Sequence, residues 1–456
     1  MNTSSFDKTT DTIAAVATPA IPSAIAILRI SGPEAFSVLR AAFHPRGKLT
    51  PRRLTIGDAF APSGAKIDEA LAVRMPAPHS YTGEDCAEIY IHGSPGVAAA
   101  VLETLFQAGA RQAEPGEFTR RAFLNGRMDL SQSEAVIDLI DSQTSAAAEN
   151  AAKQLSGVLG VQIEKARTGL LEIASQLSAQ MDFPDEEVPE IENDALSASL
   201  SEICASLSRL GESYSRGAML TQGVPCVICG RPNAGKSSLL NAIAGFDRAI
   251  VTAIPGTTRD IIEQRVVLSG QSFVFSDTAG LRESEDAVER IGVERARKAL
   301  TGAAAVIAVF DGAQALSDED MHILEEIAGK TAFLVINKAD LPQKLDTSVL
   351  KKTGFPVFSL CARTGEGVER LTDALSDKFA LSVQAGESLL TNPRQKAALD
   401  RAVQALLRAQ SAIRMLTADV VVTDLEEALF ALGEITGQSA SQEIIDGIFS
   451  RFCVGK

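Results

Sequence analysis

The sequence lacks a hydrophobic run long enough to cross a membrane. Its first twelve residues mix polar, acidic and basic side chains and do not resemble a signal peptide. Cysteines are few as well, and the six that occur are scattered along the chain and suggest no disulfide framework. Together these absences favour a cytoplasmic protein without a membrane anchor.

An excess of positive charge is also missing. The chain has 43 Lys and Arg residues against 58 Asp and Glu residues, which gives a net charge of −15. A broad nucleic-acid-binding face needs clustered Lys and Arg side chains, so this balance argues against one. Any contact with RNA should therefore be local or shared with a partner. The local basic groups are Arg46, Lys48, Arg52 and Arg53, and then Arg120, Arg121 and Arg127.

Two cysteine patterns are interpreted as ordinary packing. Cys226 and Cys229 have the spacing of a redox or metal motif, yet no second pair follows and both fall in an apolar segment. We therefore expect both thiols to lie in the core. Cys453 is fourth from the end of the sequence, but the glycine and lysine that follow do not fit a prenylation box.

At 456 residues, the chain exceeds the size of one typical hydrophobic core, so two or three domains are expected. Residues 11–123 alternate predicted strands and helices and indicate a mixed α/β domain. Asp85, Glu88 and His92 fall there on a predicted strand, and we interpret them as a solvated face near a sheet edge. The predicted strands are 24–30, 70–75 and 86–91, and the helices are 33–42 and 97–107.

The segments on either side of the centre of the chain have a helical pattern. Apolar residues recur at three- and four-residue steps from 131 to 181, and further helices are predicted over 195–217, 393–416 and 420–437. Neither helical block has enough elements to form a convincing domain alone. We therefore expect the two blocks to pack together, with the central segment inserted between them.

The central segment begins with a phosphate-binding motif. Residues 230–237 read Gly-Arg-Pro-Asn-Ala-Gly-Lys-Ser, and they follow an apolar strand and precede a helix. The N–H groups of such a loop and the positive end of the helix converge on anionic oxygens. Lys236 adds a charge for the β and γ phosphates, and Ser237 offers its hydroxyl to Mg²⁺.

Four later motifs complete a guanine-nucleotide site. Thr258 could reach Mg²⁺ from a loop about twenty residues after the phosphate motif, and Asp277 ends a strand that continues into Thr278-Ala279-Gly280. The buried strand 332–337 ends in the motif Asn337-Lys338-Ala339-Asp340, whose aspartate accepts two N–H groups that guanine has and adenine lacks. Cys361-Ala362-Arg363 resembles the Ser-Ala-Lys loop that finishes a guanine pocket, with a thiol in place of the usual hydroxyl.

A catalytic glutamine is absent after this second switch motif. Ras-like enzymes place there the glutamine that orients the attacking water, whereas this chain has Leu281. Another group must hold that water. The segment 282–297 is rich in carboxylates, and one of them is the natural candidate.

With these motifs the chain resembles the MnmE family, also called TrmE, of tRNA-modification GTPases. The resemblance rests on 27–32, 81–85 and 115–125 near the N-terminus, and on 182–187, 289–292 and 448–456, which generic GTPases do not share. It implies a P-loop Ras-like GTPase domain inserted in a helical domain and preceded by an α/β domain of folate-binding type. The implied boundaries are 1–123 for the N-terminal domain, 124–220 and 380–456 for the helical domain, and 221–379 for the GTPase domain.

The resemblance also implies partners and cofactors. Proteins of this family form homodimers through the N-terminal domains, which bind 5-formyl-tetrahydrofolate or a related one-carbon folate. With the FAD-dependent protein MnmG (GidA) they form a heterotetramer that installs a carboxymethylaminomethyl or aminomethyl group on carbon 5 of wobble uridine in tRNA. The implied folate-contacting residues are Arg29, Glu88, Arg127 and Lys456. Arg127 stands where the family commonly has lysine, and 20–24 lack the usual Gly- and Arg-containing loop.

For the nucleotide, the resemblance implies hydrolysis stimulated by K⁺, which stands where other GTPases use an arginine finger. Glu289 would orient the water, and Lys236 is the second catalytic residue. The K⁺ ligands would be Asn233, Thr252, Ile254 and Thr257, and the Mg²⁺ ligands Ser237 and Thr258. The full implied nucleotide contact set is Asn233, Ala234, Gly235, Lys236, Ser237, Ser238, Thr252, Ala253, Ile254, Pro255, Gly256, Thr257, Thr258, Asp277, Thr278, Ala279, Gly280, Asn337, Lys338, Asp340, Cys361, Ala362 and Arg363.

Two alternatives stay open at this point. A GTP-switched RNA-binding or ribosome-assembly factor would share the nucleotide motifs, but such proteins usually carry a basic RNA-binding module. A membrane-remodelling GTPase would need a cationic amphipathic or apolar insertion segment, and none is evident. Mass spectrometry of wobble uridines from cells lacking the protein separates the first alternative from a tRNA-modifying enzyme.

Overall fold

The computed structural model describes residues 11–182, 193–246, 263–277, 300–380, 388–413 and 418–456. By contacts the chain divides into two compact units. The first unit contains residues 1–137, 152–209 and 394–456, and the second contains 138–151 and 210–393. Each unit combines segments that are far apart in the sequence, which is the arrangement expected of a domain inserted into another.

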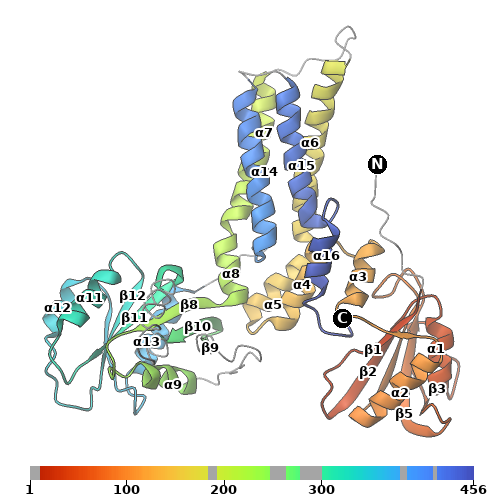
Figure 1. The fold of residues 1–456 in the computed structure, drawn as a ribbon, viewed down its shortest axis with the longest axis horizontal. Helices are drawn as coiled ribbons and strands as arrows, with labels where there is room; N and C mark the ends of the chain where they lie inside the picture. The colour runs from red at the N-terminus through yellow and green to blue at the C-terminus, as the bar shows by residue number, and fades with distance from the viewer. Residues whose placement is uncertain (1–10, 183–192, 247–262, 278–299, 381–387, 414–417) are drawn as a thin grey trace, which may run out of the picture. The chain divides into compact units, whose positions relative to one another are not determined.

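The N-terminal part of the first unit is a seven-stranded sheet with the order β3-β4-β5-β6-β2-β1-β7. Neighbouring strands are antiparallel, except that β7 runs parallel to β1. One face packs against α1 (Ala35–Ala42) and α2 (Pro95–Gln107) in a core that includes Leu28 and Ile89 (Figure 1). The strands are β1 Ile13–Val16, β2 Ser23–Ser31, β3 Phe43–Pro45, β4 Thr55–Phe60, β5 Lys66–Met75, β6 Cys86–Gly93 and β7 Arg111–Gln112.

The opposite face of this sheet is covered only in part. Short helix α3 (Glu117–Leu124) places Phe118 against Ile13 and Ala15 of β1. Strand β6 lies in the middle of the sheet, between β5 and β2. The interpretation of Glu88 as a solvated residue near a sheet edge is therefore wrong, because β6 has hydrogen-bonded neighbours on both sides.

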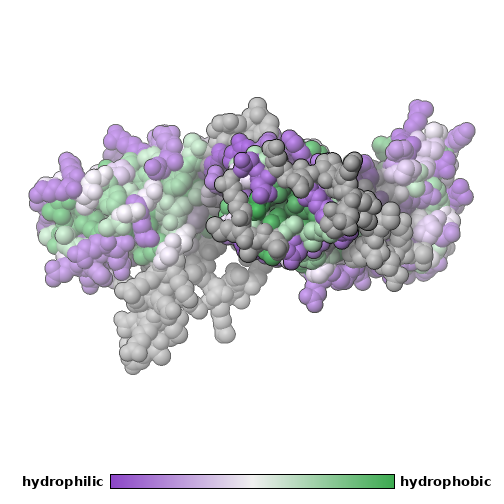
Figure 2. Space-filling model, turned by 90° about the horizontal axis from the view of Figure 1, so that it is seen from above, coloured by the Kyte–Doolittle hydropathy of each residue, from purple (hydrophilic) through white to green (hydrophobic). Residues whose placement is uncertain are grey.

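Long helices make up the rest of the first unit. Figure 1 shows α6, α7, α14 and α15 side by side, and Figure 2 shows hydrophobic residues in the middle of this bundle with hydrophilic residues around them. Arg394 at the start of α14 donates to Glu134 of α4 at 2.8 and 2.7 Å, so the early and late helical blocks are joined as expected. The helices are α4 Leu130–Asp141, α5 Ser145–Leu155, α6 Val158–Asp182, α7 Asn193–Glu212, α14 Pro393–Ala412, α15 Ala418–Thr436 and α16 Gln442–Phe449. Residues 138–151, which include the end of α4 and most of α5, belong to the second unit.

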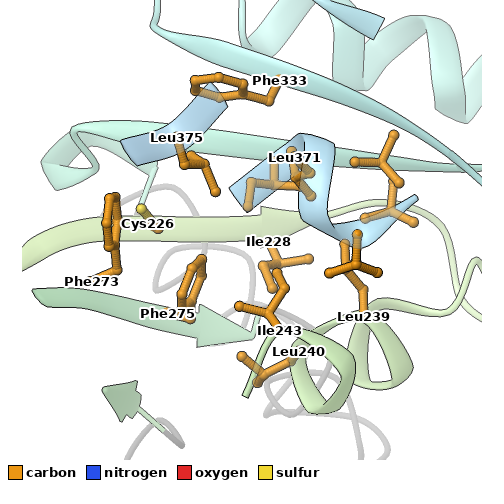
Figure 3. Packing of buried hydrophobic residues seen from close by; sticks show 14 of the residues in the cluster. Cys226, Ile228, Leu239, Leu240, Ile243, Phe273, Phe275, Phe333, Leu371 and Leu375 are labelled. Carbon is orange, nitrogen blue, oxygen red and sulfur yellow. The ribbon is translucent and has the colours of Figure 1, made fainter. Parts of the chain in front are cut away.

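The second unit contains a six-stranded sheet in the order β13-β12-β11-β8-β10-β9, parallel except for β9. Helices α9 and α13 cover one face through Leu239 and Leu371 (Figure 3), and α11 and α12 supply Leu324 and Leu350 to the other. The elements are α8 Tyr214–Gln222, β8 Val224–Cys229, α9 Lys236–Phe246, β9 Glu263–Leu268, β10 Gln271–Asp277, β11 Ala305–Asp311, α11 Asp318–Glu326, β12 Ala332–Asn337, α12 Thr347–Lys352, β13 Val357–Ser359 and α13 Val368–Lys378.

The segment 388–391, which follows the second unit's sheet in the sequence, is held by hydrogen bonds to other residues of the same unit. Residues 388–391 are buried, and the Asn150 side chain makes two hydrogen bonds to the main chain of Leu389, at 3.1 and 2.8 Å. Leu390 N donates to Ser213 Oγ at 3.1 Å. A Cβ on Gly217 of α8 would lie only 2.1 Å from the Leu390 oxygen, so this position requires glycine. The chain thus enters and leaves the inserted domain side by side.

The helix predicted over 195–217 is interrupted at one residue. Ser213 separates α7 from α8, although its own backbone stays in the right-handed helical region, with φ of −68° and ψ of −17°. Ser213 Oγ donates to Leu210 O and accepts from Leu390 N, so its side chain serves the returning segment. Periodicity within 195–217 carries no trace of this contact, because the partner is 177 residues away.

Candidate nucleotide site and N-terminal anion site

The phosphate loop connects β8 to α9 and has two positions that exclude a side chain. Gly235 has φ of 95°, and a Cβ there would lie 2.1 Å from the Asn337 amide nitrogen. At Gly230, with φ of 150°, a Cβ would lie 2.3 Å from the Val309 oxygen. The loop is therefore pressed against the ends of β11 and β12, and only glycine allows that approach.

Lys236 is held inside this loop rather than extended into solvent. Its side chain is buried, and Nζ donates to the main-chain oxygens of Gly230 at 3.0 Å and Arg231 at 2.8 Å. The ammonium group is thus fixed at the mouth of the helix N-terminus, where an anion binds best. Ser237 follows in the first turn of α9 and is exposed.

Asn337 ties the phosphate loop to the base-binding segments. It is the last residue of β12, and its Nδ2 donates to Ala234 O at 2.8 Å. Its Oδ1 accepts from Ala362 N at 2.9 Å. Three of the predicted nucleotide motifs therefore meet at one buried amide side chain, and the remaining backbone of 361–363 is placed beside Asp340.

The Asp340 carboxylate has two donors next to it. Cys361 Sγ lies 3.2 Å from Oδ1, and Arg363 Nη2 lies 2.8 Å from Oδ2. The hydrogen bond from the Cys361 thiol, followed by the charge and hydrogen bond of Arg363, lowers the pKa of Asp340 below its usual value. The group is therefore ionised at neutral pH, as needed to accept two N–H groups from a guanine edge.

A cavity of about 1110 Å³ opens next to this loop. Ser238, Asn241 and Gly245 of α9 line one side, and Ala362 and Arg363 line the other. Ser238 follows the phosphate loop in the sequence, and Arg363 is the residue that contacts Asp340, so the cavity lies between these two segments. The rest of the wall is formed by Ala242, Ser359, Thr364, Gly365, Glu366, Gly367, Glu369 and Arg370.

Replacing Cys361 with serine is expected to tighten GDP binding by about 2- to 10-fold, because a hydroxyl is a stronger donor to the Asp340 carboxylate than a thiol is. Isothermal titration calorimetry with GDP measures the change. Cys361→Ala is the matched control and should weaken binding, since it removes the donor. Equal affinity of both variants would show that this contact does not position Asp340.

Several predicted nucleotide residues lie outside the described residues, or their side chains do. Asp277 ends β10 next to Ile228 of β8, which brings its backbone beside the phosphate loop, but its side chain is not described. The remaining ones are Thr252, Ala253, Ile254, Pro255, Gly256, Thr257, Thr258, Thr278, Ala279, Gly280 and Glu289.

A second cluster of charged groups lies on the N-terminal sheet. Arg29 Nε is 2.9 Å from Glu88 Oε1, and Tyr90 Oη donates to Glu88 Oε2 at 2.6 Å. The Arg29 guanidinium stacks over the Tyr81 ring at 4.7 Å, while its buried Nη1 has no hydrogen-bond partner among the described residues. A cation held against an aromatic ring with an unused donor is suited to an anionic ligand.

Lys456 reaches this cluster because the C-terminal segment docks on the sheet. Val454 forms an antiparallel bridge with Pro115, and a Cβ on Gly455 would lie 2.4 Å from the Val16 oxygen. Burial and the nearby Arg29 charge lower the pKa of Lys456. Arg127 makes a different contact, from Nε to Ser80 O at 3.2 Å, which joins it to the loop that carries Tyr81.

The two cysteines of the apolar strand are core residues, as expected. Cys226 and Cys229 are both buried in β8. Burial raises the pKa of Cys226 strongly and that of Cys229 to about 12, so both thiols are protonated and unsuited to redox or metal chemistry.

Comparison with known proteins decides what these sites belong to. Residues 130–453 match the family model for the MnmE helical domain, and residues 12–127 match the model for the N-terminus of the GTP-binding protein TrmE. The chain belongs to the MnmE family.

Full-length relatives agree with this membership. The tRNA modification GTPase MnmE of Natranaerobius thermophilus is 41% identical over 98% of this chain and 100% of its own length. That of Symbiobacterium thermophilum is 44% identical over 98% of this chain and 99% of its own length. The G domain of the T. maritima FeoB iron transporter aligns with 35% of this chain and 99% of its own at 27% identity, with a TM-score of 0.27.

Membership in the MnmE family makes the protein a GTP hydrolase with a role in tRNA modification. The fold expected from the sequence is confirmed: an N-terminal TrmE domain precedes a helical domain with an inserted P-loop domain. Among the described helices, none is both long and apolar enough to cross a membrane.

Some residues of both sites lie outside the sequence motifs. Tyr81 and Tyr90 contact Arg29 and Glu88, and Asp311 and Asp320 contact cations of the nucleotide site. Asp311 had a detectable signal, since it ends an apolar strand beside the one that carries Asn337. Tyr81 lies in the segment 81–85, on which the resemblance partly rests, whereas Tyr90 and Asp320 are identified only by their tertiary contacts.

Proposed function

We propose that the protein is a K⁺-stimulated GTPase that works with the FAD-dependent partner MnmG on wobble uridine of tRNA. In this proposal the two proteins assemble into a heterotetramer in the cytoplasm. The complex installs a carboxymethylaminomethyl or aminomethyl group on carbon 5 of the wobble uridine. A folate of the 5-formyl-tetrahydrofolate type donates the carbon. The observation that carries the proposal is that one chain holds both a guanine-nucleotide site and a separate cationic, aromatic site. The division into 1–123, 124–220, 221–379 and 380–456 is part of it.

The K⁺ part of the proposal starts from Asn233 in the phosphate loop. This residue is exposed, and its φ of 62° places it in the left-handed region at the tip of the loop. Its amide oxygen and the backbone oxygens of Thr252, Ile254 and Thr257 would be the ligands. A monovalent cation there would neutralise charge that develops near the β–γ bridge. Mg²⁺ would be held by Ser237 and Thr258.

Hydrolysis is expected to be at least about 10-fold faster in K⁺ than in Na⁺ at equal ionic strength, since a fixed positive charge at the transferred phosphate lowers the barrier by more than 1 kcal/mol. Phosphate release measures the rate.

Glu289→Ala should abolish hydrolysis but leave GDP affinity within about 2-fold, because Glu289 would act only on the attacking water. Equal rates in both salts would refute the K⁺ site, and normal hydrolysis by the variant would refute the role of Glu289.

The folate part of the proposal is supported by the chemistry of the N-terminal cluster. A pterin presents N–H groups that a carboxylate such as Glu88 can accept, and a folate tail presents carboxylates that suit Arg29 and Lys456. The Tyr81 ring adds an apolar surface for a planar ligand. Arg127, bound to the same loop, would support that surface.

Replacing Arg29 with glutamine is expected to weaken 5-formyl-tetrahydrofolate binding by about 10-fold or more, since a charged hydrogen bond contributes roughly 1.5–3 kcal/mol. Calorimetry with the folate measures it, and GTP hydrolysis should stay unchanged. Arg74→Gln is the matched control, because Arg74 lies on the same sheet and stacks over Phe36 instead. If both variants bind the folate as the unchanged protein does, the cluster is not the folate site.

A homodimer is proposed from the uncovered part of the same sheet face. Ile27, Tyr90, Leu71 and Ile56 stand opposite one another across β2, β6, β5 and β4. Ile56 is 46% exposed and Leu71 39%. An apolar row of this kind on an antiparallel sheet suits a second copy of the chain. Its neighbour Glu88 would then lie close to the interface, which would link dimer formation to the folate site.

A further inference from the structure

Two buried aspartates flank the connection from β11 to α11. Asp311 is the last residue of β11 and is 4% exposed, and Asp320 lies in the first turn of α11 and is 1% exposed. A buried carboxylate is unfavourable unless a cation or several donors accompany it. Each of these two aspartates meets a cation that belongs to a nucleotide motif.

Asp311 holds the lysine of the guanine-reading segment. Lys338 Nζ donates to Asp311 Oδ2 at 2.7 Å, and Ala313 N donates to Oδ1 at 3.0 Å. Asp311 stands opposite Asn337 in the β11–β12 register, and Lys338 is the residue that follows the end of β12. Lys338 has φ of 62°, and its long side chain would otherwise be free to rotate. The ion pair therefore fixes the direction in which the ammonium group points.

Asp320 holds the second residue of the phosphate loop. Arg231 Nε lies 2.9 Å from Asp320 Oδ1, while Oδ2 accepts from the Ser317 main chain and hydroxyl at 3.0 Å each. Among the described residues, no hydrogen bond of normal geometry reaches Oδ1, so the Arg231 charge is what compensates it there. The Arg231 oxygen in turn accepts from Lys236 Nζ at 2.8 Å. Asp320 is thus connected to Lys236 through one residue.

We propose that Asp311 and Asp320 are positioning residues for GTP, each acting through the cation that it holds. Asp311 orients Lys338 beside the base, and Asp320 fixes Arg231 and with it the main-chain oxygen that holds Lys236. Residues 311–320 thereby set the base end and the phosphate end of the nucleotide site from a single connection. Neither aspartate needs to touch the nucleotide.

A double-mutant cycle tests the first half of the proposal. Asp311→Asn should weaken GDP binding by about 10-fold and raise KM for GTP by a similar factor, with kcat within about 2-fold. On a Lys338→Met background the same change should cost less than about 2-fold, because the residue through which Asp311 acts is gone. Equal losses on both backgrounds, or unchanged GDP affinity in the single variant, would overturn the proposal. A lower melting temperature by itself would not produce this pattern.

The second half has its own cycle and control. Asp320→Asn and Arg231→Gln should each lower kcat/KM for GTP by about 10-fold. The kcat/KM of the double variant should lie within about 2-fold of that of the less active single variant. Asp318→Asn is the matched control, because Asp318 is exposed in the same helical turn. Additive losses, or an equal loss from Asp318→Asn, would overturn the assignment of Asp320, since either result would indicate general damage to α11.

Discussion

Replacing Asp340 with asparagine is expected to weaken binding of both GTP and GDP by about 10²- to 10³-fold. The carboxylate would accept two N–H groups of the guanine, and a hydrogen bond to a charged group contributes roughly 1.5–3 kcal/mol. Asparagine would turn one acceptor into a donor and point it at the guanine N–H groups. The contacts from Cys361 and Arg363 would weaken as well, since both depend on the negative charge.

Xanthosine triphosphate makes this test specific, because it has an oxygen where guanosine has the amino group. Asp340→Asn should bind it more tightly than it binds GTP, which reverses the preference of the unchanged protein. Competition for a fluorescent GDP analogue measures both affinities. Asp346→Asn is the matched control, since Asp346 accepts from Ser348 N at the start of α12, whereas Asp340 accepts from Cys361 and Arg363. Retained guanine preference in Asp340→Asn would remove Asp340 from base recognition.

Replacing Lys236 with methionine is expected to lower kcat/KM for GTP by about 10²- to 10³-fold, the loss typical of removing one preorganised donor to a developing charge. Methionine keeps the length of the side chain and removes only the ammonium group. Its two contacts to Gly230 and Arg231 would disappear, so the phosphate loop would also lose the group around which it is folded. Single-turnover hydrolysis measured with purified protein reports the change.

Lys330→Met separates this effect from the general loss of a lysine contact to the main chain. Lys330 Nζ also donates to a main-chain oxygen, that of Leu300 at 2.8 Å, but serves no nucleotide motif. Hydrolysis by this control should stay within about 2-fold. A Lys236→Met variant that hydrolyses GTP at half the original rate would contradict the role of its charge.

The local parts of the nucleotide site could be predicted from the sequence because they are short and continuous. The apolar run before Gly230 coincides with β8, and the strand before Lys338 coincides with β12. Strand, loop and helix follow one another within about twenty residues, and the glycines mark the turn. Position in the chain is then nearly equivalent to position in space.

The supporting contacts could not be predicted in this way. Asp320 and Arg231 are 89 residues apart, and nothing in either neighbourhood indicates the other. Glu88 was interpreted as solvated because alternation on a strand cannot say whether the strand is central. Arg29 lies 59 residues from it, and only the pairing of β2 with β6 brings the two together.

Short elements were missed for a related reason. Helices α3 and α16 have eight residues each and were not predicted, although α1, which has the same length, was. Their apolar residues are used in contacts with distant segments, as when Phe123 of α3 packs in one cluster with Phe449 of α16. The sequence contains these residues, but their pairing depends on a fold that joins both ends of the chain.

The buried return segment sets the places where the inserted domain can be exchanged for another. Asn150 forms hydrogen bonds with Leu389, and Ser213 with Leu390, just before the chain enters α14. In a chimera that replaces 224–379 with another domain, Asn150, Ser213 and the segment 388–391 all remain in this protein. Their hydrogen bonds would then hold the two ends of the new domain close together. Replacing 213–391 instead would remove Ser213, Leu389 and Leu390, so Asn150 would lose the main-chain groups with which it forms hydrogen bonds.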